Sequence, residues 1–246
     1  IINRLPLRFN FDPYYFNDKY QGLPADGYTA VFRRMFDSPR IDVRLGVDFF
    51  AVRESLSPEQ LIVYSGPIDR YFDYRLGELS WRTLDFERQA VDSDDYQGAA
   101  VLNYADEDVH YTRIHEFKHL HPERRYTAGR TLICREYSRW ARRGDEPYYP
   151  VNTARDRQLL AAYKVLAGRQ PNVLFGGRLG SYQYLDMHQA IAAALSDFRK
   201  KIAPVWNRKT HDRNADTARG DAAEEGIGSS VLSLPGHGIA AEPESA

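Results

Sequence analysis

Six short runs rich in β-branched and aromatic residues follow one another over residues 41–137, with no long helical pattern between them. Each run is bounded by Gly, Pro, Asp or Asn, which are typical of strand ends and turns. Strands in succession without crossover helices predict a mostly antiparallel sheet. The predicted strands are residues 41–47, 61–64, 82–86, 99–103, 111–119 and 131–137.

Helical periodicity is confined to the two sides of this strand-rich region. Residues 27–35 place Tyr28, Val31, Phe32 and Met35 on one face, and residues 156–166 place leucines and a tyrosine on one side. Beyond residue 206 the chain has no aromatic residue and is dominated by Ala, Gly, Ser and charged residues. This composition predicts a disordered tail over 206–246.

A short apolar strand at Val173–Phe175 runs into a glycine-rich turn and then into a helical pattern. Gly177 allows the backbone to approach a ligand, and a following helix N-terminus offers free N–H groups to an anion. Arg178 adds a cationic fork suited to phosphate or to an electron-rich ring. The same pattern also fits a plain strand–turn–helix connection that carries a surface arginine.

Charge and cysteine content exclude several classes of function. The formal net charge is −1, so no overall positive field favours nucleic acid or an anionic membrane. The single cysteine, Cys134, forms no intramolecular disulfide and suits a reducing compartment. There is no run of 18 apolar residues and no signal peptide. We therefore predict a cytoplasmic protein that neither inserts into a membrane nor binds nucleic acid.

An ordered series of short motifs runs over residues 1–203. These motifs begin at Arg4, Tyr15, Tyr20, Gly27, Tyr64, Arg82, Asn103, Tyr111, Arg135, Pro147 and Gly177, and the last of them reads GRLG-x-Y-x-YLDM. The series resembles the UDP-galactopyranose mutase family, and its last motif is similar to the flavin-contacting segment of that family.

The resemblance implies roles for residues that match the substrate site of the family. Arginines at the positions of Arg4 and Arg113 hold the diphosphate of the substrate, and we assign both as catalytic. Planar, permanently charged guanidinium groups suit this task better than lysine. The other predicted substrate-binding residues are Tyr15, Phe16, Asn103, Tyr149 and Tyr184.

The resemblance also implies a reduced FAD cofactor. The predicted cofactor-binding residues are Gly177, Arg178, Tyr184, Asp186 and Met187. Asp186 is slightly better interpreted as the N-cap of the last helix. Glu136 matches a family carboxylate near the active site, and its alternative role is a salt bridge within the sheet.

The histidine-rich run at residues 110–121 invites interpretation as a metal site. On a strand, His115, His119 and His121 would share the face of Arg113. No carboxylate or cysteine stands at a diagnostic ligand spacing, however, and the resemblance implies no metal. We predict no metal site.

A dinucleotide-binding GxGxxG motif is absent from the start of the chain. We therefore expect a fragment of α/β architecture that is itself α+β. Its expected parts are a substrate-binding sheet domain (1–171), the last strand and helix of a Rossmann-like FAD domain (172–205) and the tail (206–246). We expect the chain to be inactive alone and the intact protein to form a homo-oligomer.

The function implied by the resemblance is the interconversion of UDP-galactopyranose and UDP-galactofuranose through a covalent adduct of the sugar with reduced FAD. No protein nucleophile is required, which agrees with the lack of a catalytic triad. Two alternatives stay open. One is a non-catalytic UDP-sugar-binding module, and the other is a related flavin-dependent oxidoreductase.

Overall fold

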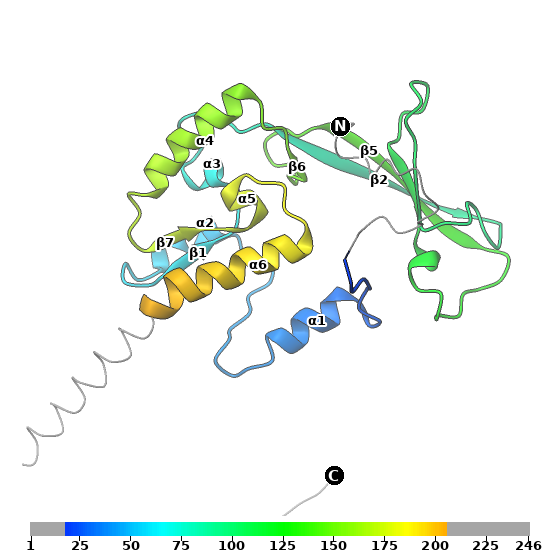
Figure 1. Ribbon diagram of the computed structural model, residues 1–246, viewed down its shortest axis with the longest axis horizontal. Helices are drawn as coiled ribbons and strands as arrows, with labels where there is room; N and C mark the ends of the chain where they lie inside the picture. The colour runs from blue at the N-terminus through cyan, green and yellow to red at the C-terminus, as the bar shows by residue number, and fades with distance from the viewer. Residues whose placement is uncertain (1–17, 206–246) are drawn as a thin grey trace, which may run out of the picture. The chain divides into compact units, whose positions relative to one another are not determined.

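The computed structural model describes residues 18–205, and the predictions for Arg4, Tyr15, Phe16 and the 206–246 tail lie outside these residues. The chain forms two compact units, divided between Tyr184 and Leu185. The first unit contains an antiparallel sheet, a small parallel sheet and several helices, so the α+β class is confirmed (Figure 1).

The larger sheet has five strands in the order β3-β4-β5-β2-β6, and all of its neighbouring pairs are antiparallel. The two longest strands, β2 and β5, run side by side and pair from Arg82 with Trp140 to Val91 with Thr131 (Figure 1). The strands are β2 (Trp81–Val91), β3 (Val101–Asn103), β4 (Arg113–Glu116), β5 (Thr131–Trp140) and β6 (Tyr149–Pro150).

Two of the strand predictions are wrong: one predicted strand does not form, and another is shorter than predicted. Residues 41–47 form no strand, because they are exposed, have no pairing partner and contain Gly46 at φ +69°. The run at 111–119 is a strand only over β4, and it then tightens into the 3₁₀ segment η3 (Phe117–Leu120). A strand needs a partner ladder as well as β-favouring residues, and neither segment has one along its full length.

The smaller sheet pairs β1 (Ile62–Tyr64) with β7 (Val173–Phe175) in parallel. Its sides are lined by short helices and by α4, and a buried aromatic cluster fills the space between them. In that cluster Phe72 stacks on Tyr163 and Phe175, with ring centroids 5.8 and 5.7 Å apart. The helices of this region are α2 (Phe49–Val52), η2 (Arg53–Ser55), α3 (Ile68–Tyr71), α4 (Ala154–Ala167) and α5 (Gly177–Ser181).

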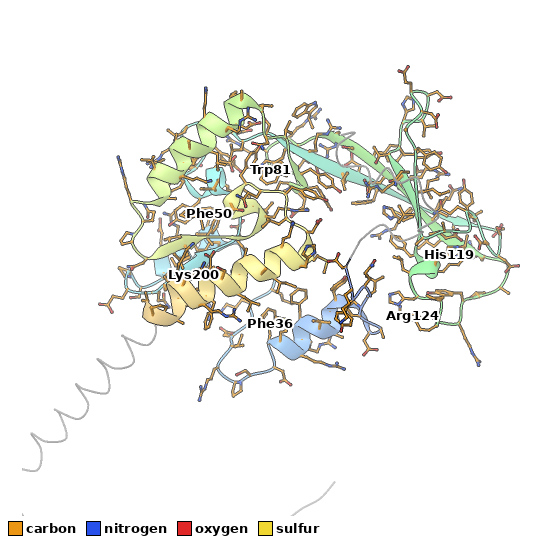
Figure 2. All side chains as sticks on the ribbon, viewed as in Figure 1. Phe36, Phe50, Trp81, His119, Arg124 and Lys200 are labelled. Atoms are coloured by element: carbon orange, nitrogen blue, oxygen red, sulfur yellow. The ribbon has the colours of Figure 1, made fainter. Side chains whose placement is uncertain are left out.

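Trp81 marks the point where this core meets the larger sheet (Figure 2). Its ring packs edge-on against Tyr182 with centroids 4.9 Å apart, and the Tyr182 hydroxyl donates to the carbonyl of Ser80 at 2.6 Å. Burial is the main reason that the pKa of Tyr182 rises to about 12, so this phenol remains a hydrogen-bond donor at neutral pH. The start of β2 is thereby held against the segment that follows the glycine turn.

Helix α4 begins with a capping box, as the sequence Thr153-x-x-Asp156 favours. The Thr153 hydroxyl accepts from the N–H of Asp156, and the buried Asp156 carboxylate accepts from the N–H of Thr153. The predicted helix at 27–35 is confirmed as α1 (Gly27–Met35), and its apolar face is exposed.

The second unit contains α6 (Met187–Asp197) followed by the π-helical turn η4 (Phe198–Ile202). Asp186 is the N-cap residue of α6, and its N–H donates to the side chain of Gln189 at 2.9 Å. The capping interpretation of Asp186 is therefore confirmed. Within residues 18–205, no helix is long and apolar enough to cross a membrane.

Candidate functional site

One row of the larger sheet brings three predicted residues together. Arg113 on β4 lies opposite Asn103 on β3 and opposite Glu136 on β5. Residues that face each other across antiparallel strands point to the same side of the sheet, so their side chains are neighbours. The row places an amide, a guanidinium and a carboxylate side by side on one face.

Glu136 is the buried centre of this row. Its Oε1 lies 3.3 Å from the Nε of Arg113 and accepts from the Thr112 hydroxyl at 3.2 Å, while its Oε2 lies 3.2 Å from the Nε2 of His115. Only 5% of the Glu136 side chain is exposed, whereas 36% of the Arg113 side chain is. The carboxylate thus fixes the inner edge of the guanidinium and leaves part of the side chain accessible.

Arg113 is held by charge more than by hydrogen-bond geometry. Its Nε is buried, and it makes no hydrogen bond to any residue that the structure describes. Glu136 is also the one carboxylate within ion-pair distance of this guanidinium in residues 18–205. The Nη groups of Arg113 make no hydrogen bond to residues 18–205 either, and 36% of the side chain is exposed, so these groups could donate to an anionic ligand.

A second cluster consists of Tyr149, Tyr184 and Arg178. The two tyrosine rings are stacked, with centroids 5.8 Å apart and planes inclined by 18°. The Arg178 guanidinium carbon lies 4.5 Å from the Tyr184 ring centroid and 5.8 Å from that of Tyr149. Its Nη1 donates to the carbonyl of Tyr148 at 3.2 Å, and no acidic side chain within the described part of the chain pairs with it.

Tyr149 connects the two clusters electrostatically. Burial is the largest cause of the raised pKa of its phenol, and the negative charge of Glu136 raises this pKa further. The charges of Arg113 and Arg178 act in the opposite direction. The phenol therefore remains a neutral hydrogen-bond donor close to both guanidinium groups, which suits a ligand rich in oxygen acceptors.

The glycines of the turn are explained first by packing. A Cβ on Gly180 would lie 2.9 Å from the carbonyl oxygen of Tyr64, so only glycine lets α5 approach the end of β1 this closely. Gly177 has φ +70°, a conformation that favours glycine, and a Cβ there would lie 3.4 Å from that of Ser65.

The other predicted site residues lie outside these two clusters. Asp186 and Met187 begin the second unit, where Asp186 caps α6 and Met187 is exposed. Arg4, Tyr15 and Phe16 lie outside the described residues.

The histidine run divides into two environments. His115 does share the face of Arg113, as predicted, but His119 and His121 do not follow on the same strand, because β4 ends at Glu116. His119 instead lies on η3 (Figure 2), with its Nε2 3.2 Å from Asp95 and 3.4 Å from Glu116. Ligand atoms of these three residues lie within 4.8 Å of one another.

Protein groups already satisfy Glu116, the buried member of this cluster. It accepts from the Thr131 hydroxyl at 2.7 Å and from the N–H groups of Tyr96 and Gln97, and the Lys118 ammonium lies 3.2 Å away. Burial alone would raise its pKa, but these hydrogen bonds outweigh burial and lower the pKa to about 2. The cluster joins the 95–98 loop to the sheet.

Sequence reasoning missed the contact between His115 and Glu136 and the hydrogen bond from Thr112. The alternation of side chains along a strand predicts that His115 and Arg113 share a face. The position of Glu136 between them depends on the register of β4 on β5, for which the sequence contains no local signal.

The fold and these side chains define an α+β module with a cationic, tyrosine-rich site beside an antiparallel sheet. Residues 1–184 match the family model for UDP-galactopyranose mutase. The chain belongs to this family.

Two similar proteins have the same level of identity but different names. A dTDP-fucopyranose mutase from Escherichia coli is 41% identical over 199 residues, which cover 79% of this chain and 52% of that protein. A probable UDP-galactopyranose mutase from Klebsiella pneumoniae is 41% identical over 210 residues, covering 85% and 53%. A UDP-galactopyranose mutase from Mycoplasma pneumoniae is 35% identical over 213 residues, covering 80% and 52%. The chain spans about half the length of these relatives.

Proposed function

We propose that this chain provides the nucleotide-sugar site of an isomerase that interconverts UDP-galactopyranose and UDP-galactofuranose. The observation that carries the proposal is the pairing of a partly exposed Arg113 with buried Glu136, beside the Arg178–tyrosine cluster, in a member of this family. Family membership favours a mutase over the related flavin-dependent oxidoreductase.

In this proposal Arg113 binds the diphosphate of the nucleotide sugar. The negative charge on the departing nucleotide must be stabilised and retained while the bond to the sugar is broken, and a fixed guanidinium does both. The phenols of Tyr149 and Tyr184 donate to phosphate oxygens, and Asn103 contacts the sugar from the next strand. Arg4, Tyr15 and Phe16 are proposed to complete the site.

The chemistry of the second cluster fits a flavin. Arg178 is a cation with no acidic partner among residues 18–205, and it lies over an aromatic ring, an environment that suits an electron-rich ring system. Gly177, Arg178, Tyr184, Asp186 and Met187 are the residues that would hold the FAD. When bound in reduced form, FAD supplies the nucleophile for the anomeric carbon, so these residues need only bind, orient and exclude water.

The architecture and assembly of the whole protein belong to the same proposal. We assign residues 172–205 to a Rossmann-like FAD domain and residues 1–171 to a sheet domain, and the parallel pairing of β1 with β7 fits a Rossmann-like sheet to which residues 62–64 also contribute. We propose a cytoplasmic homo-oligomer. Because the relatives are about twice as long, we expect turnover only when this chain is combined with the other half of a family member.

A chimera tests the proposed reaction directly. This chain would replace the corresponding half of the Klebsiella pneumoniae relative, and the protein would be incubated with FAD, dithionite and UDP-galactofuranose. Chromatography would detect UDP-galactopyranose. We expect conversion by the chimera, strong loss on Arg113→Ala and none by the chain alone. A folded chimera that binds FAD but converts nothing would contradict the proposal, whereas UDP-sugar binding without conversion would favour the binding-module alternative.

A second candidate reaction follows from the Escherichia coli relative, which is as similar as the Klebsiella pneumoniae one. The substrate would then be dTDP-fucopyranose and its furanose form. The Arg113 and tyrosine contacts proposed above engage the diphosphate that both substrates share. Parallel assays of the chimera with both nucleotide sugars distinguish the two by their kcat/KM values.

A further inference from the structure

The Glu136 carboxylate has two basic neighbours, and the proposed function uses only one of them. Arg113 lies at Oε1, with its Nε 3.3 Å away, and His115 lies at Oε2, with its Nε2 3.2 Å away. Each carboxylate oxygen therefore has its own basic partner. Glu136 itself is 5% exposed, so water cannot readily replace either of them.

The fold holds the His115 ring in this position. His115 follows Arg113 by two residues on β4 and lies opposite Cys134 on β5, so its side chain projects from the same face. Its ring stacks on Phe117 with centroids 5.6 Å apart and planes inclined by 5°. With 18% of its side chain exposed, His115 is oriented by packing but remains within reach of solvent protons.

We propose that His115 is a positioning residue for anion binding, which holds Oε2 of Glu136 and so sets how strongly this carboxylate neutralises Arg113. The inference rests on the proposed function, because it takes the anion to be the diphosphate of a nucleotide sugar. His115 itself does not contact the ligand in this arrangement.

The charged groups around Glu136 indicate the direction of the effect. The ionisable groups here are Arg113 and His115 on β4, Arg88 on β2 opposite Cys134, Cys134 on β5 itself, and Tyr149 on β6. Burial is the main cause of the raised pKa of both the thiol and the phenol, so neither ionises near neutral pH. Histidine is the side-chain type that changes charge between about pH 5 and 8.

Protonation of His115 changes the charge that a ligand meets. With neutral His115, the charges of Arg113 and Glu136 cancel. When His115 is protonated, Arg113, Glu136 and His115 together have a net charge of about +1. The carboxylate is then shared between two cations, so it neutralises Arg113 less. The diphosphate of UDP-galactose is esterified at both ends and keeps a constant charge over this range. Binding of UDP-galactose should therefore strengthen as the pH falls.

Titration calorimetry with UDP-galactose at about pH 6 and 8 tests this inference. We expect wild-type affinity to be about three- to tenfold higher at the lower pH. His115→Gln preserves a hydrogen bond to Glu136 but cannot titrate. Its affinity for UDP-galactose should therefore be the same at both pH values and close to that of wild type at the higher pH. His115→Leu removes the contact and should bind about three- to tenfold more weakly than His115→Gln at both. His121→Gln is the matched control, because its imidazole pairs with Glu123 on the surface, and it should behave like wild type.

A ligand-free measurement separates this inference from the proposed function. In ¹H–¹⁵N spectra of the imidazole groups, Glu136→Gln should move the Nε2 resonance of His115, which lies 3.2 Å from Oε2 of Glu136, and leave the resonances of His121 unchanged. If wild type binds UDP-galactose and His115→Leu retains both the affinity and its pH dependence, the inference is overturned while the proposed function stands. If wild type does not bind, the nucleotide-sugar proposal fails together with the ligand part of this inference. An unchanged His115 resonance in Glu136→Gln would then also refute the contact.

Discussion

Glu116→Gln is the perturbation whose effect on stability the structure defines best. Glutamine has the shape of a protonated glutamic acid, so it replaces the carboxylate of this fully buried residue with a neutral group. The carboxylate accepts from Thr131, Tyr96 and Gln97, and these bonds favour its charged form. The substitution therefore reports how much the charge at this position stabilises the fold.

The magnitude follows from the pKa of Glu116. Its ordinary value of 4.5 falls to about 2 in the folded protein. Each pKa unit corresponds to about 1.4 kcal/mol, so the folded state favours the charged over the neutral carboxyl by about 3–4 kcal/mol. Because the folded pKa lies below the unfolded one, this stabilisation is fully present above about pH 4.5 and is lost as the pH falls towards about 2.

Urea denaturation followed by circular dichroism measures the effect. At pH 7 we expect the free energy of unfolding of Glu116→Gln to be about 3–4 kcal/mol below that of wild type, and the difference should shrink steadily below about pH 4.5. Glu123→Gln is the control, because that carboxylate is exposed and pairs with His121 and Arg124. A difference under about 1 kcal/mol at pH 7, or one that does not change with pH, would refute the reasoning.

Three other substitutions test single contacts of the core by the same denaturation assay. Gly180→Ala should lower the free energy of unfolding by about 1–3 kcal/mol, since its Cβ would meet the Tyr64 carbonyl, whereas Gly22→Ala, with open space around it, should not. Tyr163→Phe should lose about 1 kcal/mol with the hydrogen bond to Gly77, while the exposed Tyr126→Phe should lose little. Thr153→Ala should lose about 1 kcal/mol with the α4 cap, in contrast to the exposed Thr127→Ala. A variant that unfolds like its control would refute the role given to that contact.

Local features of the fold were predictable because their causes lie close together in the sequence. The helix at 27–35 follows from the spacing of its apolar residues, and β7 follows from a short apolar run that a glycine turn ends. The predicted strand at 41–47 failed because β-favouring residues do not provide a pairing partner. The parallel pairing of β1 with β7 joins segments far apart in the sequence, which local patterns do not specify.

The residues of the candidate site were predictable from local motifs, whereas one of their contacts depends on the pairing of distant strands. Arg113, Tyr149, Tyr184 and Arg178 were identified from motifs, and the structure places Tyr149 beside the other three. The shared carboxylate of Glu136 emerges only from the register of β4 on β5. That register depends on the connections between the strands, so residue type alone left Glu136 between an active-site role and a sheet salt bridge. The structure shows it paired with Arg113 inside the sheet.

Binding of UDP-galactose to this chain and to Arg113→Ala is the most direct test of the proposed site. The control is Arg130→Ala, since Arg130 is an exposed arginine that pairs with Asp92. If Arg113 binds the diphosphate, calorimetry should show affinity about 10- to 100-fold weaker in Arg113→Ala and unchanged in Arg130→Ala. Equal affinity of wild type and a correctly folded Arg113→Ala would contradict the central claim that this guanidinium binds the nucleotide sugar.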